Sequence, residues 1–401
     1  MASPMASLLT IDVALREILA RVSPLAAEAV SIESAAGRVL ARDARGAVDL
    51  PPFPSSAMDG FAVRAADTPG SLVVVDRIAA GRPASRELGD GEAMAIATGG
   101  VVPPGADAVI PIEYVVQHDN SIEIDNRTEA GAHVRPRGGD LGAGDVVVLA
   151  GTLLRPAEIG ALAAAGLDEV ECALRPRAAV VTTGTELRRP GEPLEPGQIY
   201  EANGVMLAAA LASAGAAVVP PASAADDEQE HRAALERGLE ADVLVTSGGV
   251  SVGPHDLVRK IEADLGVTEV FWKVAMKPGK PLSFGVRGKT LVFGLPGNPV
   301  SALVCFELFV RPTLLALQGA RTPGPVFARG ELAASVRRNP ERDELLRARS
   351  RDEGGRVLLE PLVGQESHMI ARAAAADTLV LAARGEGELA AGTMVSFLPL
   401  R

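Results

Sequence analysis

The feature that most constrains the fold is a regular alternation of apolar, strand-like runs and helical stretches that begins near Arg175. Buried strands are expected at 178–182, 217–219, 242–246 and 291–294, with helices between them. Polar, glycine-rich residues follow several of these runs, and ligands bind at the carboxyl ends of strands in open α/β sheets. The sequence therefore predicts a parallel α/β domain over 176–322 with a ligand site at one sheet edge.

The rest of the chain predicts further domains, because 401 residues exceed what a single core normally holds. Residues 8–40 are expected to be helical, with Thr10 and Asp12 as N-capping residues. Short β-like runs separated by Gly and Pro fill 51–135, and 156–166 has the Pro start and Gly end of a helix. We expect an α/β multidomain protein composed as follows: a helical linking domain (1–50 and 136–175), a β-rich module (51–135), the α/β domain (176–322) and a C-terminal β-barrel (323–401).

Composition narrows the class of protein. A hydrophobic content of 47% with 22% charged residues is typical of a soluble globular chain, and the net charge of −12 argues against nucleic-acid binding. The N-terminus has no basic segment followed by a sustained apolar stretch, and no uncharged apolar run of membrane-spanning length follows. These observations predict a cytoplasmic protein with no membrane partner.

Neither cysteine nor histidine offers an obvious metal site. Cys172 and Cys305 lie far apart in apolar surroundings without CxxC spacing, and the five histidines are scattered. Acid–base chemistry is therefore expected from carboxylates and lysines.

Lysine is concentrated in one segment. The chain has five Lys against 34 Arg, and three of the five are Lys273, Lys277 and Lys280, next to the only tryptophan, Trp272. A lysine ammonium is a compact point charge, whereas the arginine guanidinium is a flat fork. The segment therefore indicates a site for compact oxyanions; the alternative is a basic surface loop of chance composition.

A glycine-rich loop at 247–256 follows one expected strand. Gly248 and Gly249 let the backbone approach a ligand, Ser247 and Ser251 add hydroxyl groups, and backbone amides there could face phosphate oxygens. A tight turn without a ligand is the alternative. Asp256 at the end of the loop is placed to hold Mg²⁺ or polarise a water molecule.

Two further carboxylates are expected on the same edge. Glu186 closes the loop after the first strand, and Asp226 precedes a helical stretch, where N-capping is the alternative role. Glu186, Asp226 and Asp256 facing Lys273 and Lys277 would suit metal-assisted phosphoanhydride chemistry, with Asp226 and Asp256 as the Mg²⁺ ligands.

Several stretches together resemble the MoeA family, the molybdopterin molybdenumtransferases that complete molybdenum cofactor biosynthesis. They occur in the family's order and span nearly the whole chain. They are 54–62 (PSSAMDGFA), 98–99 (TG), 104–109 (PGADAV), 135–140 (RPRGGD), 184–187 (GTEL), 247–256 (SGGVSVGPHD), 272–281 (WKVAMKPGKP) and 295–299 (LPGNP).

The resemblance implies a homodimer of four-domain subunits. In that family the α/β domain binds adenylylated molybdopterin, molybdate enters, and AMP leaves as the metal is transferred to the dithiolene. The pterin substrate supplies the soft sulfur ligands, so Cys172 and Cys305 need not participate. Mg²⁺ is the expected cofactor, and a molybdopterin adenylyltransferase and molybdoenzyme chaperones are the expected protein partners.

The resemblance also implies roles for individual residues. Ser251, Lys277, Lys280 and Pro281 would line the oxyanion site. Arg347 and Ser367 of the barrel would complete it, although Glu366 stands before Ser367 where the family often has Gly. Asp59 and Thr98 of the β-rich module would serve the active site of the other subunit; a turn-stabilising role is the alternative for Asp59.

Two other functions stay open at this point. A molybdopterin adenylyltransferase shares the α/β domain but would lack the Ala57-Met58-Asp59-Gly60 module and the barrel. A gephyrin-like scaffold has the same fold, usually fused to a second catalytic domain through a long linker. The sequence does not distinguish molybdate from tungstate as the substrate.

Overall fold

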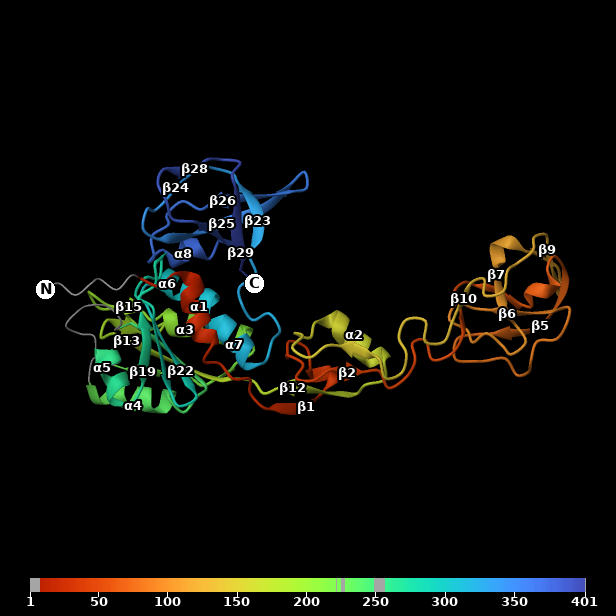
Figure 1. Cartoon of the computed structure of the whole chain (residues 1–401), viewed down its shortest axis with the longest axis horizontal. Helices are drawn as coiled ribbons and strands as arrows, with labels where there is room; N and C mark the ends of the chain where they lie inside the picture. Colours follow the sequence, from red (N-terminus) through yellow and green to blue (C-terminus); the bar gives the residue numbers. More distant parts are fainter. Residues whose placement is uncertain (1–7, 221, 225–227, 249–256, 401) are drawn as a thin grey trace. The chain divides into compact units, whose positions relative to one another are not determined.

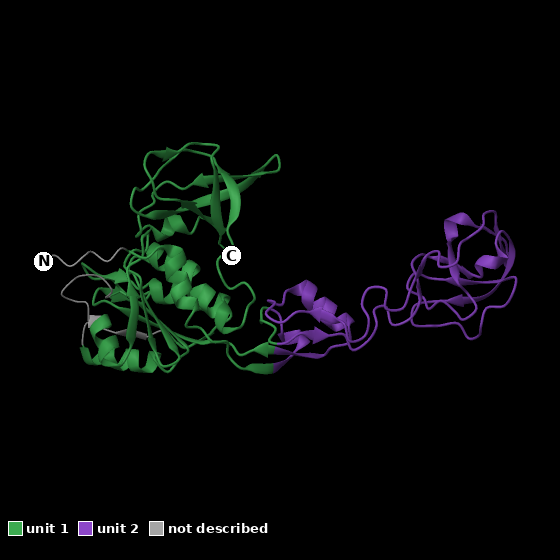
Figure 2. Ribbon diagram, viewed as in Figure 1, with its two compact units in different colours: residues 1–28, 37–41, 172–401 green, residues 29–36, 42–171 purple. Residues whose placement is uncertain are grey.

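The computed structural model describes residues 8–220, 222–224, 228–248 and 257–400. This described part of the chain divides into two compact units (Figures 1 and 2). Unit 1 comprises Met1–Glu28, Gly37–Ala41 and Cys172–Arg401, and unit 2 comprises Ala29–Ala36 and Arg42–Glu171. The domain boundaries drawn from the sequence are finer than this division and stay a prediction.

A mixed sheet forms the centre of the α/β domain in unit 1. Strand β13 pairs with β16, β17 and β18, and β18 pairs with β22, all in parallel. Strand β21 is antiparallel to both of its neighbours, β22 and β19. The predicted parallel sheet is thus confirmed for its larger part, and the antiparallel β21 is an addition that the sequence did not predict. The bounds are β13 (Arg177–Thr183), β16 (Ala217–Val218), β17 (Ala222–Ala224), β18 (Val243–Ser247), β19 (Thr268–Trp272), β21 (Ser283–Arg287) and β22 (Thr290–Leu295).

Helices cover both faces of this sheet because its strands are apolar on both sides. Val243 and Val245 of β18 face a core shared with helices α1 (Ile11–Leu19), α3 (Asn203–Ser213) and the 299–317 helix, while Leu244 faces helices α4 (Glu228–Gly238) and α5 (Leu257–Asp264). The resulting three-layer arrangement leaves the strand ends and their loops to form a site.

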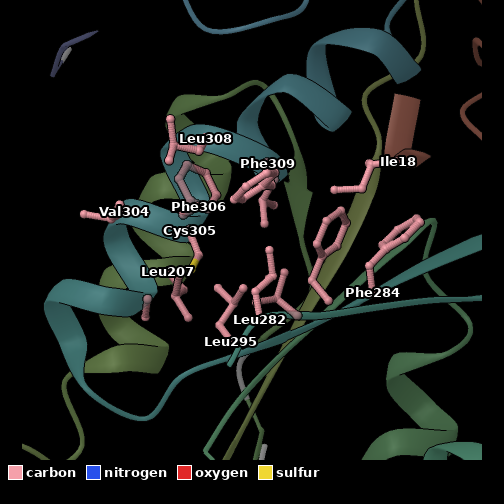
Figure 3. Packing of buried hydrophobic residues seen from close by; sticks show 14 of the residues in the cluster. Ile18, Leu207, Leu282, Phe284, Leu295, Val304, Cys305, Phe306, Leu308 and Phe309 are labelled. Atoms are coloured by element: carbon pink, nitrogen blue, oxygen red, sulfur yellow. The ribbon is translucent and has the colours of Figure 1, made fainter. Parts of the chain in front are cut away.

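The larger core is aromatic as well as aliphatic (Figure 3). Phe284 and Phe293 have ring centroids 5.0 Å apart. Cys305, Phe306 and Phe309 pack in the same cluster. These side chains are almost completely buried. The cluster fixes the 299–317 helix against the sheet.

That helix consists of α6 (Pro299–Cys305), the π-helical turn η4 (Phe306–Val310) and α7 (Arg311–Leu317). Among the described residues it is the one helix whose length and apolar composition would allow it to cross a membrane, and 78% of it is buried in the structure. Glu307 and Arg311 form an ion pair of 2.6 Å on it. These features are those of a core helix.

The C-terminal region closes into the predicted β-barrel. Strand β25 pairs with β26 and β27, β26 with β23, and both β23 and β27 pair with β29, which closes the circle. Short strand β20 of the lysine segment adds to β25 in parallel. The bounds are β20 (Met276–Lys277), β23 (Ala328–Leu332), β25 (Asp343–Glu353), β26 (Arg356–Pro361), α8 (Ile370–Ala373), β27 (Thr378–Ala382) and β29 (Met394–Pro399), with β24 (Val336–Arg337) paired to β28 (Glu388–Leu389).

Unit 2 contains the predicted β-rich module. Its main sheet has the strand order β7-β4-β6-β5-β9-β8 and buries aliphatic side chains on both faces. Helix α2 (Pro156–Ala164) begins at the proline that the sequence indicated. The bounds are β2 (Ala44–Arg45), β3 (Ser55–Ser56), β4 (Gly60–Val63), β5 (Gly70–Ile78), β6 (Glu92–Ile96), β7 (Ala108–Pro111), β8 (Val116–Gln117), β9 (Ser121–Ile124), β10 (Val134–Arg135) and β11 (Val146–Val148).

The expectation of helix throughout 8–40 is wrong beyond α1. Helix α1 begins after Thr10, whose hydroxyl accepts a bond from Val13 N as predicted, but it ends at Leu19. Pro24 disfavours the helical conformation in the residue before it. The chain then forms strand β1 (Ala27–Ser31), which pairs with β12 (Glu169–Ala173). Pairing with a distant strand thus overrides the local helical pattern.

Candidate functional site

The strand register places the expected site residues of the α/β domain along one sheet edge. Trp272 pairs with Ser283, Ser283 with Gly294, Gly294 with Thr246, and Thr246 with Val181. This row of residues lies near the carboxyl ends of β13, β18, β22 and β19. The residues that follow each of these strands therefore emerge at the same edge, as predicted.

The end of β18 is held closely against the neighbouring strand ends. Gly248 has φ +97, and a Cβ there would lie 2.7 Å from the Thr183 carbonyl oxygen, so only glycine fits. Ser247 is 2% exposed, and its hydroxyl accepts a bond of 2.9 Å from Asn203 Nδ2. The same amide donates to the Gly297 carbonyl oxygen at 2.7 Å, which ties the end of β18 to the 295–299 loop. Gly249, Ser251 and Asp256 lie outside the described residues.

Lys273 lies against the only tryptophan. Its Nζ is 3.6 Å from the centroid of the Trp272 ring, and Arg259 Cζ of helix α5 is 4.1 Å from the same ring. Arg259 also forms an ion pair of 2.6 Å with Glu269. Lys273 adopts φ 77, a left-handed conformation that is uncommon for a residue other than glycine. The cation–π contact therefore holds this ammonium group over the indole ring.

Lys277 and Lys280 flank a glycine that is part of the core. Gly279 is buried with φ +109, and Cys305 Sγ and Met276 leave no room for a Cβ. Both lysine side chains are exposed, Pro281 is half-buried, and the Lys280 carbonyl oxygen accepts a bond of 2.9 Å from Val274 N. Lys277 Nζ lies 2.8 Å from Glu344 Oε1 of the barrel. The segment thus presents its cations from a rigid base.

The two barrel residues expected at the oxyanion site, Arg347 and Ser367, differ from each other in their surroundings. Arg347 is 2% exposed and donates through Nη1 and Nη2 to the carbonyl oxygens of Glu366 and Gly364, at 3.1 and 2.8 Å. Burial lowers the pKa of the Arg347 guanidinium, an effect opposed by the Glu366 carboxylate. Ser367 Oγ accepts a bond of 2.8 Å from Asn298 Nδ2, and its carbonyl oxygen accepts one from Val300 N. Arg347 therefore shapes the loop that brings Ser367 to the 295–299 loop.

In unit 2 the structure brings Asp59 and Thr98 together. Asp59 Oδ1 accepts bonds from Thr98 N at 2.7 Å and from Thr98 Oγ1 at 3.1 Å, and both residues are exposed. Gly60 is required next to them, because a Cβ there would lie 2.0 Å from the Ile110 carbonyl oxygen. Asp59 thus organises a turn and also presents a carboxylate at the surface of its module.

The expected Mg²⁺ ligands are only partly visible. Glu186 is exposed at the sheet edge, whereas Asp226 and Asp256 lie outside the described residues. Within 8–220, 222–224, 228–248 and 257–400 no group of three His, Cys, Asp or Glu side chains could hold a metal ion. The described residues therefore do not by themselves build a magnesium site.

Three residues of this region were not assigned from the sequence. Asn203 bridges two loops, Asn298 holds Ser367, and Glu344 pairs with Lys277. Asn298 lies within the 295–299 stretch that carried the resemblance. Asn203 is the first residue of helix α3. Glu344 has no local signal, because its partner is reached only through the pairing of β20 with β25.

The fold and this edge define an α/β protein whose cationic segment is paired with a C-terminal barrel. Family models match along the chain: the MoeA N-terminal region (domain I and II) over residues 9–166, a probable molybdopterin binding domain over 179–316, and the MoeA C-terminal region (domain IV) over 329–400. The chain belongs to the MoeA family, and it is an enzyme.

Named relatives support this membership. The chain is 40% identical over 381 residues to molybdopterin molybdenumtransferase 2 of Mycobacterium tuberculosis, covering 91% of this chain and 93% of that protein. It is 33% identical over 399 residues to the molybdopterin molybdenumtransferase of Haemophilus influenzae, covering 98% of each. The crystal structure of a molybdopterin biosynthesis MoeA protein from Pyrococcus horikoshii superposes with a TM-score of 0.80 at 32% identity, covering 98% of this chain and 100% of that one. The predicted family and fold class are thereby confirmed.

Proposed function

We propose that this enzyme inserts molybdenum into adenylylated molybdopterin and releases AMP, which would make it the last enzyme of molybdenum cofactor biosynthesis. The observation that carries the proposal is the rigid lysine segment at the carboxyl edge of the α/β sheet. The chain also matches relatives named molybdopterin molybdenumtransferase over 93% and 98% of their length. A compact, strongly charged oxyanion such as molybdate suits lysine ammonium groups at fixed positions.

The pterin and its nucleotide would lie along the sheet edge. Gly248 at the end of β18 permits a close backbone approach to a ligand, and the bonds from Asn203 to Ser247 and Gly297 keep this strand end in place. Lys273, Lys277 and Lys280 would stabilise negative charge on phosphate and molybdate oxygens. Glu186 would contribute a carboxylate on the same edge.

Mg²⁺ is part of the proposal but not of the described geometry. Asp226 and Asp256 would hold it, and a divalent cation would neutralise charge on the phosphoanhydride that is cleaved. Protein partners are also proposals, namely an adenylyltransferase that supplies the substrate and chaperones that receive the product, all in the cytoplasm.

Adenylylated molybdopterin, molybdate and Mg²⁺ supplied to the purified protein provide the test. We expect AMP release that requires molybdate, together with a product that activates a cofactor-free molybdoenzyme. Formation of adenylylated molybdopterin from ATP and molybdopterin would instead identify an adenylyltransferase. If the folded protein catalyses neither reaction, that result would favour a scaffold role.

A homodimer with shared active sites is the second part of the proposal. The Asp59–Thr98 pair supports it, because an exposed carboxylate held by two hydrogen bonds at a module surface is suited to act on a neighbouring chain. Mixing Asp59→Ala chains with Lys277→Ala chains should leave one intact site per heterodimer, so activity up to about a quarter of wild type should return. No recovery despite verified heterodimers would place both residues in the site of one chain, or Asp59 outside the site.

A further inference from the structure

Lys277 forms an ion pair with a carboxylate of the barrel. Its Nζ lies 2.8 Å from Glu344 Oε1, and the Lys277 side chain is 54% exposed whereas that of Glu344 is 10% exposed. A carboxylate this far from water depends on its partner, because an uncompensated buried charge is costly. Asn339 Nδ2 is a second, distant partner at 3.5 Å. Glu344 is therefore held mainly by Lys277.

Backbone pairing makes this contact a fixed feature of the fold. Strand β20 pairs with β25 in parallel, with Met276 opposite Asp343 and Lys277 opposite Glu344. Asp343 N also donates to the Ala275 carbonyl oxygen at 3.2 Å. The two side chains are thus brought together by the strands that carry them, so the pair forms whenever the barrel is docked on the lysine segment.

The pair has a consequence for anion binding. An oxyanion approaching Lys277 meets an ammonium group already engaged by a carboxylate, and it also meets the negative charge of Glu344. Like charges at short range oppose binding, most strongly where water is partly excluded. The chain has few other lysines, and Lys273 lies against Trp272, so the state of Lys277 weighs heavily in the charge of the site.

We propose that Glu344 is a positioning residue that competes with the oxyanion for Lys277 and keeps the affinity for free molybdate low. This inference rests on the proposed function. Weak binding would allow the oxyanion to exchange until the pterin substrate is in place.

Calorimetric titration with sodium molybdate tests the inference on the intact protein. Glu344→Gln keeps the shape of the side chain and removes its charge. The dissociation constant for molybdate should fall about tenfold, as expected for the removal of one nearby charge from a half-exposed site. The KM for molybdate should fall in parallel while kcat does not rise, because the change strengthens molybdate binding equally in the ground state and the transition state.

Glu331→Gln is the matched control. Glu331 lies on β23 of the same barrel and pairs with Arg356 at 3.4 Å. Its removal should leave the molybdate affinity unchanged. Glu344→Asp, whose shorter side chain retains the charge, should give a smaller increase in affinity and serves if the Gln variant does not fold.

The outcomes are distinct. Unchanged or weaker molybdate binding by a folded Glu344 variant, with normal binding by the wild type, would overturn the inference and leave the proposed function intact. An equal gain in Glu331→Gln would also overturn it, since the effect would then be a general one of net charge. No molybdate binding by any of the proteins would overturn the proposed anion site and this inference with it.

Discussion

Gly279→Ala tests whether the lysine segment is held rigid by the core. The new Cβ would lie 2.7 Å from Cys305 Sγ and 2.8 Å from Met276 Cε, and both side chains are 0% exposed. The cysteine sulfur lies among packed core side chains, so it can withdraw only by a change of χ1 into that packing or by a shift of the core helix (Figure 3). Such overpacking costs about 1–3 kcal/mol. The φ of +109 adds about 1–2 kcal/mol for a residue with a side chain.

Gly288→Ala separates the two costs. Gly288 has φ +59 in the turn between β21 and β22, and a Cβ there would meet nothing within 4 Å. This control should lose about 1–2 kcal/mol, whereas Gly279→Ala should lose roughly 2–5 kcal/mol. Denaturant unfolding followed by the fluorescence of Trp272, the only tryptophan, reports on the α/β domain that contains both glycines. Equal losses in the two variants would refute the claim that the core fixes this segment.

Three further predictions concern the site and the thiols. Lys277→Arg and Lys280→Arg should each slow AMP release roughly 10²- to 10³-fold despite the retained charge, because a planar guanidinium misdirects its donors; near wild-type rates would contradict this. Asp256→Asn should weaken Mg²⁺-dependent turnover with little change in the thermal transition, and loss of that transition with normal turnover per folded molecule would identify a structural cap. Burial raises the pKa of both cysteine thiols. Cys172 and Cys305 should therefore stay neutral and unreactive toward a thiol reagent at about pH 8 until the protein unfolds. Rapid labelling of the native chain would contradict their burial.

The sequence predicted those parts of the fold that have a local signature. The run at 178–182 lies within β13, and that at 242–246 overlaps β18, because a buried parallel strand is apolar on both faces. Ser247 and Gly248 were placed correctly at a strand end because glycine marks a close approach of two backbones. Asp59 and Thr98, which the resemblance assigned to the site of the other subunit, form a hydrogen bond with each other, and their role in that site stays a prediction.

Other parts depend on contacts between distant segments and leave no local pattern. The antiparallel β21 is an exception, because the two-residue turn at Gly288, which returns the chain as β22 beside β21, is a local hairpin signal that the prediction missed. The pairing of β20 with β25 involves only Met276 and Lys277 on one side, too short a run to show a period. The role of Arg347 in shaping the 364–367 loop could not be predicted either. Its hydrogen-bond partners are backbone carbonyl groups, which every residue has, so the sequence does not single them out.

Single-turnover analysis tests the central claim most directly. Enzyme loaded with adenylylated molybdopterin and Mg²⁺ is mixed with molybdate, and AMP and pterin-bound molybdenum are quantified over time. The proposed function predicts that the two products appear together in equal amounts, and that neither appears when molybdate is withheld or when Lys277 is replaced by Ala. AMP released without molybdate, or AMP without molybdenum in the pterin, would contradict it.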